Sequence, residues 1–132
     1  MTQPTRRQIR AALETVIFNY ANASGIPACA ENAKFIPPST TYLRCFLLPA
    51  RETNTKLCYG THVPAGVFQI DIVGELNKGA SQNEILAETI AALYPQGTRI
   101  GDVRITSPVG VSVGVAEKER YILSLSIYYS YI

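Results

Sequence analysis

The sequence is poor in the residues that build metal centres and disulfide frameworks. Its 132 residues include three cysteines, one histidine and no tryptophan. Cys29, Cys45 and Cys58 are too far apart in sequence for a zinc knuckle, and their odd number leaves at least one thiol unpaired. No phosphate-binding glycine loop is present. We therefore expect a reduced protein that needs no metal, disulfide or other cofactor.

The sequence also lacks a strong charge imbalance and a long apolar run. Twelve Lys and Arg residues stand against ten Asp and Glu residues, and the basic cluster Arg6, Arg7 and Arg10 is more typical of a solvated helix face than of a phosphate site. No apolar stretch approaches the ~20 residues of a membrane helix, and these arginines interrupt any signal-peptide core. We expect a cytoplasmic protein with no nucleic-acid specificity and no membrane contact.

Two segments have the apolar periodicity of helices. Residues 5–23 should form the first, with Thr5 and Gln8 as a capping box and Gly25 ending it. Its apolar face comprises Ile9, Leu13, Val16, Ile17 and Tyr20. Residues 81–94 should form the second, with Ser81 and Glu84 as a capping box and a buried stripe of Ile85, Leu86, Ile90 and Leu93.

The remaining regular segments alternate apolar and polar residues as strands do. They are residues 41–48, 66–73, 102–107 and 119–131, with a further short strand near 34–36. The order of helix, strands, helix, strands predicts one α+β domain over residues 1–132. Its single sheet should be mainly antiparallel, or mixed, with both helices packed on one face.

The most unusual segment is the long connection at about 49–65, which is either a loop or an extended hairpin. Loops of this length inside a compact domain are uncommon and often functional. It carries residues suited to interfaces, namely Arg51, Lys56, Tyr59 and His62. Arg99 and Arg104 flank a turn and are further candidate contacts. Tyr128 is another, because the uncharged final strand invites a subunit contact if it lies at a sheet edge; burial of both its faces is the alternative.

Two patterns suggest a hydrolase only superficially. Gly110, Ser112 and Gly114 match G-x-S-x-G, but a nucleophile elbow needs a strand before the serine and a helix after it, and here a strand follows. Cys58 and His62 lack a helical signal that would bring them together. Asp71 and Asp102, the only aspartates, show no sign of pairing and are expected to be solvated or hydrogen-bonded surface acids.

Four segments, taken in their order and spacing, resemble a known family. They are YLRCFLLPA at 42–50, GVFQIDIV at 66–73, AETIAALYPQGT at 87–98 and RYILSLSIYY at 120–129. Together they are similar to phage tail terminator-like proteins, in the class of the terminators of lambda-like siphophages. The likeness covers most of the chain, and none of the four segments is a catalytic motif.

The resemblance implies a structural, non-enzymatic protein of a phage or prophage. Terminators of this kind form a homo-oligomeric ring, usually a hexamer, on the end of the tail tube; they stop tube polymerisation and join the head connector. The implied partners are copies of the chain itself, the major tail tube protein and a connector or neck protein. The implied location is the neck end of the virion tail, after assembly in the host cytoplasm.

Other functions stay open at the level of sequence. One is a different head-tail joining or tail-completion role, because proteins with these roles use related folds. Another is a non-phage adaptor or small binding domain that uses the 49–65 segment, and a third is a hydrolase that uses Ser112 or Cys58.

Overall fold

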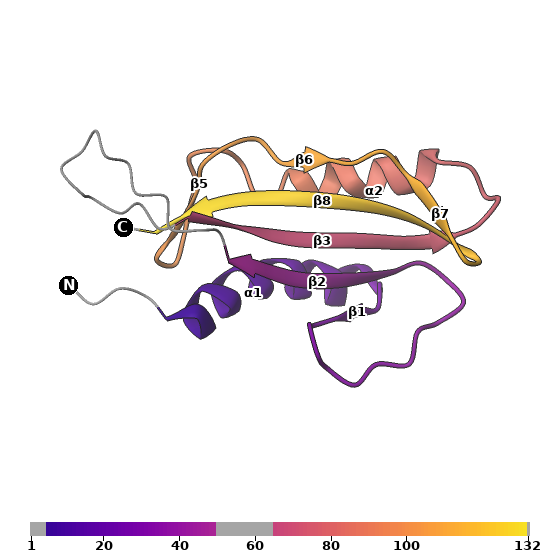
Figure 1. Ribbon diagram of the computed structural model, residues 1–132, viewed down its shortest axis with the longest axis horizontal. Coiled ribbons are helices and arrows are strands. Elements are labelled where there is room, and N and C mark those ends of the chain that lie inside the picture. Colours follow the sequence, from indigo (N-terminus) through magenta and orange to yellow (C-terminus); the bar gives the residue numbers. More distant parts are fainter. Residues whose placement is uncertain (1–4, 50–64, 132) are drawn as a thin grey trace.

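A computed structural model describes residues 5–49 and 65–131 (Figure 1). Two helices and eight strands follow one another along these described residues. They are α1 (Arg6–Ser24), β1 (Ala28–Cys29), β2 (Tyr42–Pro49), β3 (Ala65–Glu75), α2 (Ser81–Ala91), β4 (Arg99–Ile100), β5 (Val103–Ile105), β6 (Gly110–Val111), β7 (Val115–Glu117) and β8 (Arg120–Ser130).

The strands form one mixed sheet in the order β1-β2-β3-β8-β5-β4, and β6 and β7 also pair with β8. Only β1 and β2 run parallel. The centre is the antiparallel β3–β8 pair, which runs unbroken from Ala65↔Ser130 to Glu75↔Arg120. Since β8 has β3 on one side and β5, β6 and β7 on the other, the possibility that the final strand is a free edge is wrong.

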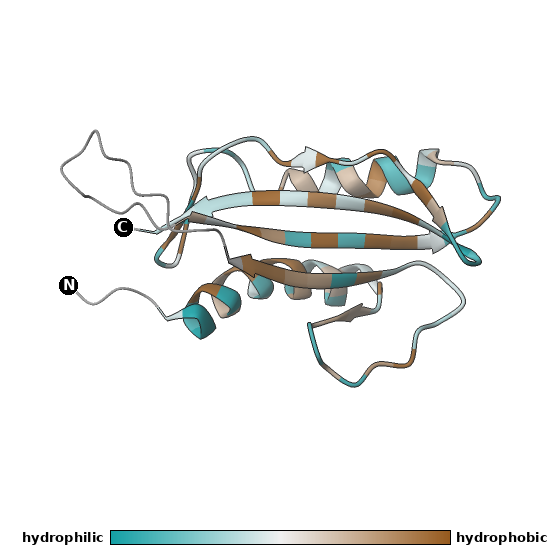
Figure 2. Cartoon of the chain, in the orientation of Figure 1, coloured by the Kyte–Doolittle hydropathy of each residue, from teal (hydrophilic) through white to brown (hydrophobic). Residues whose placement is uncertain are grey.

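Both helices cover the same face of this sheet, as the sequence predicts. The alternating residues of β2, β3 and β8 that point toward the helices are fully or almost fully buried: Leu43, Cys45, Leu47, Phe68, Ile70, Ile72, Leu123, Leu125 and Ile127. Figure 2 shows the resulting alternation of apolar and polar bands along β3. One hydrophobic cluster joins these residues to both helices, and this confirms the α+β fold class.

Helix α1 forms as the local sequence rules require. The Thr5 side chain accepts from the Gln8 backbone N–H, the Gln8 side chain accepts from the Thr5 N–H, and Gly25 closes the helix with φ +71°. Ile9, Leu13 and Ile17 are buried against the sheet, while Val16 and Tyr20 pack at the border of the core.

Helix α2 departs from the prediction in its cap, its end and its buried face. It begins after Ala80, which has helical backbone angles and no side-chain cap, so the expected Ser81–Glu84 capping box is absent. It ends at Ala91, three residues before the predicted end. Of its predicted stripe, Ile90 is buried and Leu86 and Leu93 pack against the core, which confirms them, whereas Ile85 is 61% exposed. Asn83 and Ala87 are buried in its place. Tertiary packing therefore overrides the apolar pattern here, because the polar Asn83 is buried and the apolar Ile85 is exposed.

The predicted strand near 34–36 is also wrong. The first short strand is β1, and it pairs with β2 at Ala28↔Leu43. Phe35 instead lies with its ring 5.4 Å from that of Tyr42, so side-chain stacking holds this segment rather than a ladder. Two further short strands, β6 and β7, which the alternating pattern did not predict, lie between β5 and β8.

The outer edge of β2 is closed to further strand pairing. The Leu47 N–H donates to a Glu31 carboxylate oxygen at 3.2 Å, and the Arg10 guanidinium donates to the same oxygen at 3.0 Å. Pro49 has no N–H to offer. This edge is therefore blunted against unwanted association. Neither described helix is both long and apolar enough to cross a bilayer.

Candidate interface surfaces

The residues predicted in the long connection, Arg51, Lys56, Tyr59 and His62, lie outside the described residues, as does Cys58. The strands on either side of them do pair, and the register reaches Pro49↔Gly66. The described strands β2 and β3 are therefore paired up to the point where the described residues stop. Whether residues 49–65 form a loop or an extended hairpin stays a prediction.

The structure brings Arg99 and Arg104 together. They stand opposite each other on the antiparallel β4–β5 pair, both are exposed, and with Asp102 and Ser130 they line a pocket of about 280 Å³. Gly101 makes the turn with φ +58°, and a Cβ there would lie 3.3 Å from Ala12 of α1. We call residues 99–104 the basic hairpin.

Tyr128 lies on the sheet face that the helices leave uncovered. The register aligns Leu48, Val67 and Tyr128 across β2, β3 and β8. Leu48 is 45% and Tyr128 40% exposed, whereas the inward-facing residues of these strands are fully or almost fully buried. We call these three residues the apolar row. An exposed apolar row of this kind suits a protein contact. The sequence suggested a contact for Tyr128 on a different ground, namely that the final strand could lie at a sheet edge.

The same face carries a polar network that sequence reasoning missed. Asp71 is only 5% exposed and accepts from Arg44 at 2.9 Å, Gln69 at 2.8 Å and Ser124 at 2.7 Å. The register places Arg44, Asp71 and Ser124 side by side on three adjacent strands. Because three donors hold the carboxylate, Asp71 ties the strands together; it is hydrogen-bonded, as expected, but it is buried rather than at the surface. Asp102 is exposed, as expected.

A second missed feature is a groove of about 430 Å³ between α2 and the segment before β7. Glu84 and Glu88 line one side, and Val111 and Val113 line the other. Val111 is 49% and Val113 86% exposed, so this side of the groove presents apolar side chains. We call this the acidic groove. Its two walls are distant in sequence and meet only because β6 pairs with β8.

Ser112 takes part in strand pairing and is not placed as a nucleophile. Its N–H donates to the Ser124 carbonyl at 2.8 Å, and its hydroxyl accepts from the Ser124 N–H at 3.0 Å. A Cβ on Gly114 would overlap the Tyr121 ring, so packing explains that glycine. Strand β7 follows instead of a helix. The G-x-S-x-G pattern therefore lacks the geometry of a nucleophile elbow.

The two described cysteines are free thiols, and neither is activated. Burial raises the pKa of both the Cys29 and the Cys45 thiol, which keeps them protonated at neutral pH. Among the described residues, no group of three or more His, Cys, Asp or Glu side chains comes together as metal ligands would. Exposed charged and apolar surfaces remain as the most distinctive chemistry of the described chain.

Comparisons with known proteins agree with this picture. No functionally curated protein matches the sequence. A solved structure superposes with a TM-score of 0.77 and is 28% identical in sequence, over 97% of this chain and 96% of its own. The family described as phage tail terminator protein matches residues 8–129. The chain therefore belongs to the phage tail terminator family and is a structural component of a bacteriophage tail.

Proposed function

We propose that the protein caps the end of the tail tube as a ring, ends tube polymerisation and presents the surface that joins the head connector. The family match over residues 8–129 carries this proposal. The mechanism is geometric, because a bound ring occupies the site where the next tube subunit would add. No catalytic residue is required, and the protein works at the neck end of the tail after assembly in the host cytoplasm.

Ring closure needs a heterologous contact, in which two unlike patches of one subunit meet on neighbouring copies. The chain offers such a pair. The basic hairpin carries Arg99 and Arg104, and the acidic groove carries Glu84 and Glu88 beside exposed valines. In the proposed ring, a hexamer as in its family, the basic hairpin of each copy enters the acidic groove of the next.

Contacts with the tail tube and the head connector are assigned to two other regions. The 50–64 segment contributes Arg51, Lys56, Tyr59 and His62, and the apolar row contributes Tyr128. Charged and aromatic side chains of these types are common at protein interfaces. Deletion of residues 53–62 should leave a folded protein that no longer completes tails, and normal infectious particles from this deletion would contradict the assignment.

The decisive experiment adds the purified protein to tail tubes made without it. Negative-stain images should show a ring on one tube end, and tube length should stop increasing when free tube protein is supplied. A protein with Arg99→Glu and Arg104→Glu should not form rings. Adding Glu84→Arg and Glu88→Arg to that variant should restore them, since the charges are then exchanged. Tubes that lengthen unchanged in the presence of the wild-type protein would refute the capping role.

A further inference from the structure

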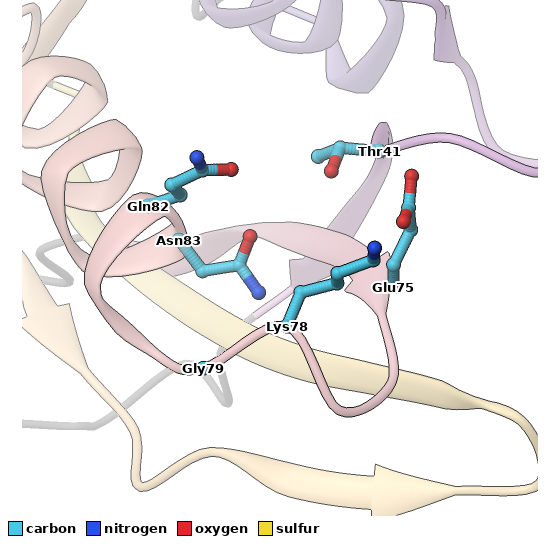
Figure 3. A pocket seen from close by; sticks show the side chains of 6 residues that line it. All are labelled: Thr41, Glu75, Lys78, Gly79, Gln82 and Asn83. Carbon is cyan, nitrogen blue, oxygen red and sulfur yellow. The ribbon is translucent and has the colours of Figure 1, made fainter.

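A polar pocket of about 280 Å³ lies where β2 begins, β3 ends and α2 begins. The elements around it lie at the opposite end of the sheet from β5 (Figure 1), and the pocket shares no lining residue with the acidic groove. Its lining is polar on every side: Thr41, Glu75, Lys78, Gly79, Gln82 and Asn83. Figure 3 shows these residues around one space: they come from the end of β3, the turn after it, the first turn of α2 and the residue before β2. Neither the fold nor the proposed tail role explains this convergence.

The positive end of α2 opens into this pocket. Glu84 is the first residue of the helix whose N–H bonds back to a carbonyl, that of Ala80 at 2.9 Å. The preceding N–H groups of the first turn, including those of Gln82 and Asn83, have no carbonyl partner within the helix. Ala80 supplies no side-chain cap. Free N–H groups and the helix dipole together favour a negatively charged group at this position.

Asn83 supplies a second, independent sign of a ligand. Its side chain is only 6% exposed, yet it makes no hydrogen bond with any residue that the structure describes. In Figure 3 its amide points into the pocket. Gly74 makes room for this orientation, because a Cβ there would overlap the amide. An amide that faces the pocket and has no partner among the described residues leaves a donor and an acceptor free for a group that enters it.

The charges at the pocket mouth oppose each other. Lys78 is placed there by a turn in which Gly79 has φ +79°, and Glu75 comes from the end of β3. The two side chains form no ion pair with each other in the described chain. Lys78 would attract an anion and Glu75 would repel it. The N-terminus of α2 then favours an anion as the ligand, and the Asn83 amide group can donate a hydrogen bond to it.

We propose that this pocket binds a small oxyanion, either a phosphate or a carboxylate group. The α2 N–H groups and the Asn83 amide donate to its oxygens, and Lys78 supplies the countercharge. A carboxylate could come from an acidic side chain of a protein partner, and a phosphate from a free ion or a phosphorylated molecule. The proposal does not depend on the tail-capping role, and either can fail without the other.

The test is a titration of the ¹⁵N-labelled full chain, followed by amide chemical shifts at constant ionic strength. Sodium phosphate and sodium acetate are the probes, and sodium chloride is the blank. The amides of residues 79–83 should shift saturably with at least one probe and not with chloride. Saturation by both identifies a general oxyanion site, by phosphate alone a phosphate site, and by acetate alone a site for a protein carboxylate.

Three substitutions separate a built site from general attraction. Lys78→Gln should weaken binding about three- to tenfold, while the matched exposed control Lys118→Gln should leave it unchanged. Asn83→Asp keeps the side-chain shape but fills the site with its own negative charge, so binding should be lost. Glu75→Gln removes the repulsion and should tighten binding. Absent shifts, or shifts that Lys78→Gln and Asn83→Asp leave unchanged, overturn the proposal.

Discussion

Helices α1 and α2 cover the same face of the sheet, but their first turns are completed in different ways. Thr5 and Gln8 satisfy the first turn of α1 with their own side chains. The first turn of α2 has no side-chain cap and opens into the pocket lined by Asn83. The first turn of α1 is thus capped by side chains of the same segment, whereas the first turn of α2 leaves backbone N–H groups free to bond to other groups.

The two helices also differ in which residues they bury. Helix α1 buries the large apolar residues that its periodicity selects, such as Leu13 and Ile17. Helix α2 buries Asn83 and Ala87 near its start and leaves Ile85 exposed. Capping and apolar periodicity in the local sequence therefore explain the start and the buried face of α1. In α2, packing against the rest of the fold decides which residues are buried. Unused donors and exposed apolar groups on α2 are what an assembly protein needs at its surfaces.

The largest expected contrast between the helices is a pair of truncations in their apolar residues. Leu13→Ala should lower the free energy of unfolding by about 2–5 kcal/mol, because Leu13 is fully buried and its removal leaves a cavity. Ile85→Ala should change it by no more than about 0.5 kcal/mol, since Ile85 is largely exposed. Urea denaturation followed by circular dichroism measures both. Equal losses would contradict the assigned burial of α2.

The next contrast concerns the caps. Thr5→Ala removes the side-chain oxygen that accepts the Gln8 N–H and should cost about 1 kcal/mol. Ser81→Ala should cost almost nothing, because Ser81 makes no cap in the structure. Thermal and urea denaturation of both variants would decide. A comparable loss for Ser81→Ala would mean that the predicted Ser81–Glu84 capping box forms after all.

Sequence alone predicts the parts of the fold that depend on neighbouring residues. The α1 cap and the apolar face of α1 follow from spacing, and the α+β class follows from the order of the elements. The two-residue strand β1 and the strands β6 and β7 escape prediction because each is held by pairing with a distant strand. The interior position of β8 cannot be predicted for the same reason, because the local sequence does not show how many strands pair with it.

Some of the candidate surfaces can likewise be predicted from the sequence, and others cannot. The spacing of Arg99 and Arg104 around a turn suffices to predict that they flank it, and the structure places them opposite each other. The acidic groove and the oxyanion pocket cannot be predicted, because their walls come from segments far apart in sequence. A buried Asn83 is equally unpredictable, since the apolar pattern favours Ile85 for the inner face.

A smaller effect tests the direct link between the helices. The Tyr94 hydroxyl, just after α2, donates to the Leu13 carbonyl of α1 at 2.8 Å in a fully buried site. Tyr94→Phe removes this bond and keeps the ring, so it should cost about 1 kcal/mol. Tyr20→Phe is the control, because the Tyr20 hydroxyl makes no hydrogen bond with the described residues. Urea denaturation that shows no difference between the two variants would contradict the link.

The smallest effect concerns Glu31, which contacts both Arg10 of α1 and the Leu47 N–H at the edge of β2. None of the ion pairs among the described residues involves α2. The Leu47 N–H and then Arg10 lower the pKa of Glu31. A lowered folded-state pKa stabilises the protein above the ordinary glutamate pKa of about 4.3, and this stabilisation disappears as the pH falls through the folded value. Because Glu31 is 37% exposed, solvent screening limits its contribution to at most about 1 kcal/mol.

Glu31→Gln should therefore lower the free energy of unfolding at pH 7 and make little difference at pH 3. Glu14 provides a control of opposite sign, because burial raises its pKa despite the attraction of Arg10. Its charged form is disfavoured in the folded state, so Glu14→Gln should not destabilise the protein at pH 7. Urea denaturation between pH 3 and pH 7 tests both. A Glu31→Gln loss that persists at pH 3 would show that packing, not charge, holds this end of α1 to the sheet.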